Sequence, residues 1–431
     1  MLGMLSFENA PPFSAPLRFF LTAPLMAALA GAILAWQGGD LLSSRWHPGM
    51  LALTHLLTLG FMLMAMLGAL IQILPVVAGA SQPQPLRLAR GLHPALLAGT
   101  LLLAGGFLAA QPLLLKLAGS VLLLAGGLFL LAAWRALREV PSTSPTIAGL
   151  KLALPALAIG LLLGAGLALA LAQGWSWPLT GLTNVHAAWA LGAWSTVLLA
   201  AVAYVVVPMF QLTPGYPARA GWLFAPALLA VTLLASAGTL AGLPALERLG
   251  MQLLAGLALA FAVQTVFLQA QRRRARPDAL HRFWQLGLVC AILGLLLLLT
   301  VNALPEAFAA PGWALLIGIL LVPGAFLPFI IGMLYKIVPF LGWLHLQNPG
   351  AGRGPAPSMG KLLPEQDALR QWRSYCLALL CLLLAVPFPE WLARPAGLLF
   401  ALSMLWLARN LFQAVRRHEA HRRGGMATEA T

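Results

Sequence analysis

Residues 54–77 read THLLTLGFMLMAMLGALIQILPVV, and this stretch decides the fold. It holds no acidic residue, lysine or arginine over its whole length. A helix that spans a bilayer needs about 20 mainly apolar residues. The stretch therefore predicts a transmembrane helix that runs from His55 to a proline, Pro75, near its end.

The same pattern returns twice along the chain. Residues 185–210 read VHAAWALGAWSTVLLAAVAYVVVPMF, and residues 315–343 read LLIGILLVPGAFLPFIIGMLYKIVPFLGW. The three prolines lie 133 and 131 residues apart, and a small residue stands seven positions before each. These positions are Pro75, Pro208 and Pro339, with Gly68, Ala201 and Gly332. Equal spacing predicts an internal repeat, and the small residues predict close helix crossings.

Further apolar runs flank these three and bring the number of predicted spans to about twelve. The runs lie near 17–37, 49–79, 94–112, 114–136, 147–173, 181–211, 219–241, 245–270, 283–304, 311–343, 374–392 and 395–415. Four helices fit each interval of the repeat. The sequence thus predicts an all-α polytopic membrane protein with three pseudo-equivalent four-helix repeats, at about 17–136, 147–270 and 283–415. They form one membrane domain over 17–415, in which the second helix of each repeat faces the centre.

Composition and charge agree with a membrane location. Hydrophobic residues make up 61% of the 431 positions and charged residues 9%, whereas soluble proteins carry about 25% charged residues. The net charge of +15 comes from loops after even-numbered helices and from the C-terminal end, which argues against nucleic-acid binding. By the positive-inside rule, the N-terminus (1–16) and the basic tail (416–431) are expected in the cytoplasm, with the domain in a bacterial-type inner membrane.

Two of the eight histidines stand out by depth. His55 and His186 precede their repeat prolines by 20 and 22 residues, inside the outer ends of two predicted inner helices. Polar residues at membrane depth are costly and mark functional sites, and imidazole is a common ligand of haem iron, copper and zinc. The alternative is a hydrogen bond to a neighbouring helix, with Thr54, Thr58 or Thr183 as candidate partners. The remaining histidines are expected to be interfacial or solvated: His47, His93, His281, His345, His418 and His421.

The acidic residues argue against a pump or secondary transporter. All eleven Asp and Glu residues fall in loops, predicted helix ends or tails, whereas proton-coupled transporters use carboxylates at membrane depth as relays or ion ligands. Walker, GxGxxG, HExxH and CxxCH motifs are also missing from the sequence.

The runs His55 to Pro75 and His186 to Pro208 resemble the second and sixth helices of haem–copper oxidase subunit I, closest to the C-family oxidase and nitric oxide reductase branch. That family has twelve helices in three four-helix arcs. The resemblance implies that His55 matches a low-spin haem ligand and that His186 matches a copper ligand. The chain departs from the family in helix 10, which lacks its His-x-His, and in residues 219–241, which lack its helix 7 histidines.

The resemblance leads to two hypotheses. In the first, a b-type haem (or copper) near the external face is held by His55 and His186, in a redox or gas-related role. In the second, the scaffold is a cofactor-free structural or assembly protein, or is channel-like. Because the ligands of the binuclear centre are incomplete, the sequence argues against an enzymatic role. The partners that fit are membrane lipid, a redox partner or small gas ligand, and a second copy of the chain.

Overall fold

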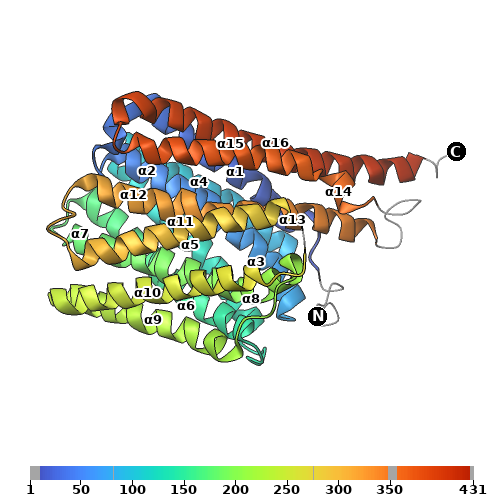
Figure 1. The fold of residues 1–431 in the computed structure, drawn as a ribbon, viewed down its shortest axis with the longest axis horizontal. Helices are drawn as coiled ribbons and strands as arrows, with labels where there is room; N and C mark the ends of the chain where they lie inside the picture. The colour runs from blue at the N-terminus through green and yellow to red at the C-terminus, as the bar shows by residue number, and fades with distance from the viewer. Residues whose placement is uncertain (1–9, 81, 275, 348–356, 428–431) are drawn as a thin grey trace.

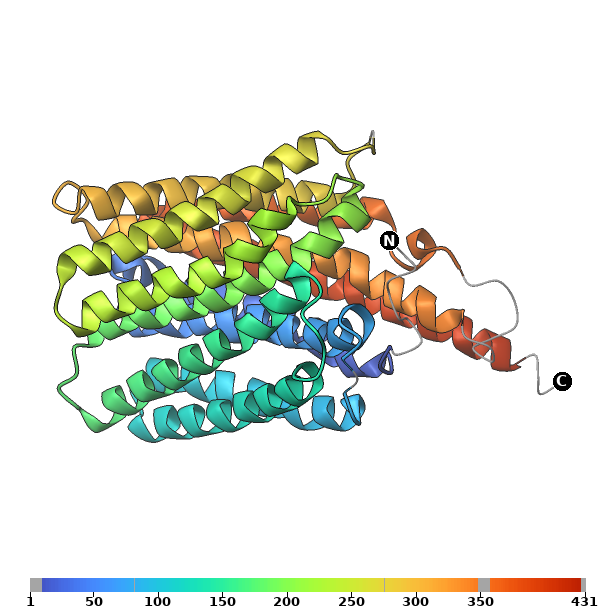
Figure 2. The same cartoon turned by 90° about the horizontal axis from the view of Figure 1, so that it is seen from below.

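The computed structural model describes residues 10–80, 82–274, 276–347 and 357–427. The described residues form helices, turns and loops and contain no β-strand. The long helices run side by side along the molecule, and the first and last described residues, 10 and 427, lie at the same end of the bundle (Figures 1 and 2). We call that end the terminal face and the opposite end the far face.

The helices follow one another in three groups of four spans. The first group is α1 (Ser14–Gln37) with a 3₁₀ turn η3 (Gly38–Ser43), then α2 (Pro48–His55), η4 (Leu56–Leu63) and α3 (Met64–Val77) as one span, α4 (Pro85–Leu108) and α5 (Pro112–Leu137). The second is α6 (Pro145–Gln173), then α7 (Leu179–Ala187), η5 (Ala188–Ser195) and α8 (Thr196–Gln211) as one span, α9 (Ala218–Leu240) and α10 (Pro244–Ala270). The third is α11 (Ala279–Ala303), then α12 (Pro311–Leu321), η6 (Val322–Phe326) and α13 (Leu327–Leu346) as one span, α15 (Glu365–Ala385) and α16 (Pro389–Ala427), with the short α14 (Met359–Leu362) before α15.

The all-α polytopic membrane fold is confirmed. Within the described residues, 11 spans are long and apolar enough to cross a membrane, and α15 is the remaining long helix. The break predicted between the third and fourth helices is present, because α4 ends at Leu108 and α5 begins at Pro112.

Both ends of the last two predicted helices were displaced, since α15 ends at Ala385 and α16 begins at Pro389. The run at 374–392 is helix α15, which begins at Glu365, because its first turns carry Glu365 and Asp367 and hydropathy misses them. Acidic residues in the first turn stabilise a helix N-terminus. The last helix was expected over 395–415 but runs to Ala427, so the basic segment from residue 416 continues α16.

The second span of each unit lies inside the bundle, as the repeat predicts. In their most apolar stretches these three spans are 78%, 61% and 61% buried, against 56% for α1 with η3 and for α16, and 33% to 39% for α4, α5, α6, α9, α10 and α11. The first helix of each unit packs against its own inner span: α1 against α3, α6 against α8, and α11 against α13. The fourth helix of each unit packs against the first helix of the next, so the units close into a ring.

The three small residues of the repeat lie at close crossings, each against the first helix of its own unit. A Cβ added to Gly68 would lie 2.7 Å from the Cβ of Phe19 in α1. One added to Gly332 would lie 3.1 Å from the Cβ of Phe283 in α11. Ala201 holds the same place in the second unit, since its Cβ would lie 2.7 Å from one added to Gly149 in α6.

Each inner span also contains a π-helical segment. The segments η4, η5 and η6 end at Leu63, Ser195 and Phe326, 12 or 13 residues before the repeat prolines. A π-helical turn holds one more residue than an α-helical turn and recurs at functional sites. The three units therefore share a backbone feature in addition to the proline and the small residue seen in the sequence.

Candidate functional site

The structure brings His55 and His186 together. His55 is the last residue of α2, and His186 lies one residue before the end of α7, so a π-helical segment follows each of them closely. Their ring centroids are 6.5 Å apart, and the angle between the ring planes is 17°. Two residues from different units, 131 positions apart in the sequence, thus form one pair toward the far face.

Each ring is held by a hydrogen bond from Nδ1 to a backbone carbonyl oxygen. Nδ1 of His55 lies 2.8 Å from the oxygen of Leu51, one turn earlier in the same helix. Nδ1 of His186 lies 3.0 Å from the oxygen of Gly160 in α6. Because a carbonyl only accepts, Nδ1 carries the proton in both rings, and in neutral imidazole Nε2 then carries a lone pair.

Neither Nε2 atom forms a hydrogen bond within the part of the chain that the structure describes. Both side chains are half-buried. The threonine partners suggested by the sequence are not used, since Thr58 donates to the carbonyl of Thr54. The pair therefore presents two lone pairs held by fixed rings.

The walls beside the pair come from α4 and α6. The ring of Phe107 lies 5.4 Å from that of His55, centroid to centroid. Gly164 faces His186 so closely that an added Cβ would lie 2.9 Å from its Cε1 atom. Sequence reasoning missed both residues, although Gly160 and Gly164 form a small-xxx-small pair, which is a signal for close packing in membranes.

The third unit has no counterpart to the pair. Its equivalent region in α12 contains Gly318, and a Cβ added there would meet no atom within 4 Å. Among the described residues, no group of three or more His, Cys, Asp and Glu side chains lies close enough together to hold a metal ion. The site consists of two imidazoles.

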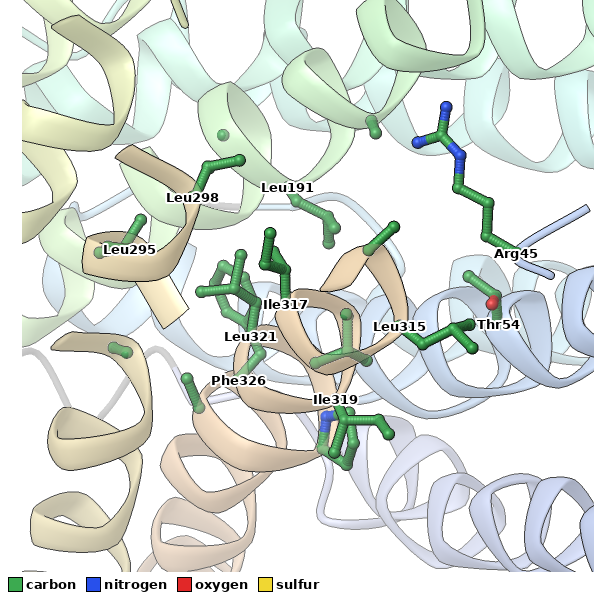
Figure 3. A pocket seen from close by; sticks show the side chains of 18 of the residues that line it. Arg45, Thr54, Leu191, Leu295, Leu298, Leu315, Ile317, Ile319, Leu321 and Phe326 are labelled. Atoms are coloured by element: carbon green, nitrogen blue, oxygen red, sulfur yellow. The ribbon is translucent and has the colours of Figure 1, made fainter. Parts of the chain in front are cut away.

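A cavity of about 650 Å³ borders the same two helices, although neither histidine lines it. Thr54 and Ala187, the sequence neighbours of the two histidines, line it, and many of its other lining residues come from α1, η5, α10, α11, α12 and η6. Figure 3 shows Leu191 of η5 facing Ile317 of α12 across this space. The cavity is mostly apolar, and its size is that of a small-molecule site.

Polar side chains gather where this cavity nears the far face. Arg45 donates from Nη2 to Oδ1 of Asn184 at 2.9 Å and joins the loop before α2 to α7. Burial lowers the pKa of the Arg45 guanidinium, which still stays protonated at neutral pH because its ordinary value is so high. Glu247 and Arg248 of α10 also line the cavity.

The other histidines lie apart from the pair, and two of them differ from expectation. His281 and His418 are 3% and 6% exposed, so the interfacial prediction was wrong for both. Nδ1 of His281 lies 3.0 Å from Oε1 of Gln211, and Nδ1 of His418 lies 3.1 Å from the oxygen of Gly342. Packing against a neighbouring helix buries these helix-end side chains.

Comparison with models of known protein families found no match, and a search of curated proteins found none either.

Proposed function

We propose that this protein binds one b-type haem through His55 and His186 and has a redox or gas-related role in the membrane. The observation that supports the proposal is the proximity of the two imidazoles, 6.5 Å apart between centroids. Two iron–nitrogen bonds of about 2 Å, with about 1 Å from each nitrogen to its ring centre, give about 6 Å between the rings of a bis-histidine haem.

The protonation pattern suits an axial ligand pair. A metal-bound histidine usually donates its other ring N–H to a carbonyl or carboxylate, which fixes the tautomer and the orientation of the ring. Leu51 and Gly160 provide such carbonyls. A porphyrin supplies the four equatorial nitrogens, so two protein ligands suffice. A zinc ion held by protein alone takes three or four ligands.

The surroundings also fit a flat, apolar group. Phe107 offers an aromatic face, and Gly164 allows the His186 ring to pack closely against α6. A haem bound there would supply one-electron transfer, or a coordination position for a small gas after loss of one axial ligand. The cavity behind Thr54 and Ala187 would give an apolar partner access to the same two helices.

A second candidate is the cofactor-free scaffold. The observation that favours it is the hydrogen bond from His186 to Gly160 of α6, because a histidine whose role is to join two helices makes such a bond. In that case both imidazoles serve packing alone.

An absorbance spectrum of the purified protein, oxidised and then reduced, separates the two candidates. We expect a Soret band and a sharp α-band on reduction, and their loss in His55→Ala and in His186→Ala. His345→Ala is the matched control, since that ring bonds the carbonyl of Leu341 at the terminal face, and its spectrum should equal the wild type. A protein purified from haem-sufficient cells without a Soret band, and without copper by elemental analysis, would establish the scaffold instead.

A further inference from the structure

A second cavity of about 650 Å³ opens toward the terminal face, where the three inner spans approach their repeat prolines. Its walls come from α3, α8 and α13 and are almost wholly aliphatic or aromatic, with residues such as Val76, Val205 and Ile337. It is separate from the histidine pair, which lies toward the far face. Water alone is a poor occupant of so apolar a space.

Gln72 of α3 lines this cavity and is 7% exposed. Its Oε1 atom is buried and has no hydrogen-bond partner among the described residues, and its amide nitrogen forms no bond there either. A buried amide without partners costs free energy. The amide nitrogen of Gln72 is therefore a donor to which an oxygen of a ligand would add a hydrogen bond, whereas Oε1 is itself an acceptor and gains nothing from an anion.

Lys336 of α13 stands three residues before Pro339, as Gln72 stands three before Pro75, and it lines the same cavity. Its ammonium lies 5.7 Å from the ring centre of Phe210 and 3.9 Å from Oδ2 of Asp278. That carboxylate oxygen is already held at 2.6 Å by Arg274, another lining residue. Two cations share one carboxylate, which leaves a net positive charge at the cavity wall.

We propose that this cavity binds an amphiphile with an anionic head group, a fatty acid or an anionic phospholipid, whose head lies against Lys336 and Gln72. The apolar walls exclude a hydrated inorganic anion, and a neutral hydrocarbon would leave the net positive charge of the wall without a counter-ion. A carboxylate or phosphate accepts charge-assisted hydrogen bonds from both groups. The acyl chain supplies the apolar surface that the valine and isoleucine walls need.

Native mass spectrometry of the delipidated, detergent-purified protein tests this inference. The probes are oleate against oleyl alcohol, and dioleoyl phosphatidylglycerol against dioleoyl phosphatidylcholine. We expect the anionic member of at least one pair to bind at least tenfold more tightly, and the pair that responds identifies the source of the head group. Equal binding within both pairs overturns the proposal.

Two variants locate the site. Lys336→Gln and Gln72→Leu should each weaken binding of the anionic probe severalfold, with the charge substitution the stronger. Lys361→Gln is the matched control, because Lys361 is an exposed lysine of α14 that does not line the cavity. If Lys361→Gln weakens binding as much as Lys336→Gln, the anion sits on the surface and the inference fails. A folding defect in Gln72→Leu would show as a lower melting temperature and leaves Lys336→Gln as the decisive variant.

Discussion

The orientation of the His186 ring depends on Gly164, a residue without a side chain. Gly164→Ala adds a methyl group 2.9 Å from the Cε1 atom of the ring, so the imidazole has to turn. We expect haem retention to fall by about tenfold, the scale on which residues that orient metal ligands act. The ratio of haem to protein, measured as the pyridine haemochrome, checks it. Gly127→Ala is the control, because a Cβ there meets no atom within 4 Å, and an equal loss in both variants contradicts the prediction.

The pairing of the histidines could be predicted in part. Equivalent depth in two inner helices follows from counting back from Pro75 and Pro208. That the two rings approach each other depends on the rotation of each helix about its axis, which the π-helical segments after His55 and His186 alter. A backbone widening of this kind leaves no mark in hydropathy. Phe107 could not be predicted either, because the sequence of an apolar helix does not show whether an aromatic residue faces lipid or a ligand.

At the scale of the element, the π-helical segment η5 sets the rotation of α7 about the helix axis relative to α8. A π-helical segment equals an α-helix with one inserted residue, so deleting Ala190 should restore α-helical geometry. His186 would then rotate by about 100° relative to α8. We expect the Soret band to disappear while the melting temperature falls only modestly. Deleting Gly215 from the loop after α8 is the control, and an intact Soret band without Ala190 would refute the dependence on η5.

Helix ends were the least predictable elements, and α15 shows why. Its first turns hold Glu365, Asp367, Arg370 and Arg373, which lower the hydropathy of a segment that is nonetheless helical. Buried tertiary partners provide the stability that apolar composition does not. Gln371 is fully buried and donates from Nε2 to Oγ of Ser403 in α16 at 3.1 Å. Because a hydropathy scan scores these charged residues as non-membrane, it places the start of the helix at residue 374 instead of Glu365.

At the scale of the whole molecule, the ring closes where α1 meets α16. A Cβ added to Gly31 would lie 2.7 Å from the backbone oxygen of Gly397, and one added to Gly397 would lie 2.4 Å from the nitrogen of Ala35. Gly31→Leu should therefore separate the two helices and cost roughly 1–3 kcal/mol. Thermal unfolding in detergent measures it. Gly256→Leu, where a Cβ meets no atom within 4 Å, should melt like the wild type.

The repeat explains why so much of this architecture followed from sequence. Proline spacing set three units, and small residues at Gly68, Ala201 and Gly332 set the same crossing in each. The glycine contact that closes the ring did not follow, because Gly31 and Gly397 belong to the first and last helices and no repeat relates them. Contacts between the first and last helices depend on the angle at which each unit packs against the next. That angle is set by side-chain packing and cannot be read from the repeat.

The orientation of the molecule in the membrane is the remaining global property, and the positive-inside rule predicts a cytoplasmic terminal face. The test uses a variant without Cys290, Cys376 and Cys381. Single cysteines replace Ser176, in the loop between α6 and α7 at the far face, and Ser358, just before α14 at the terminal face. Both serines are exposed, so both positions are open to labelling. A membrane-impermeant maleimide applied to spheroplasts should label Ser176→Cys and spare Ser358→Cys until the cells are lysed. The reverse pattern would place the histidine pair toward the cytoplasm. Electrons or a gas would then reach the pair from inside the cell, so this measurement fixes the side on which a redox partner is to be sought.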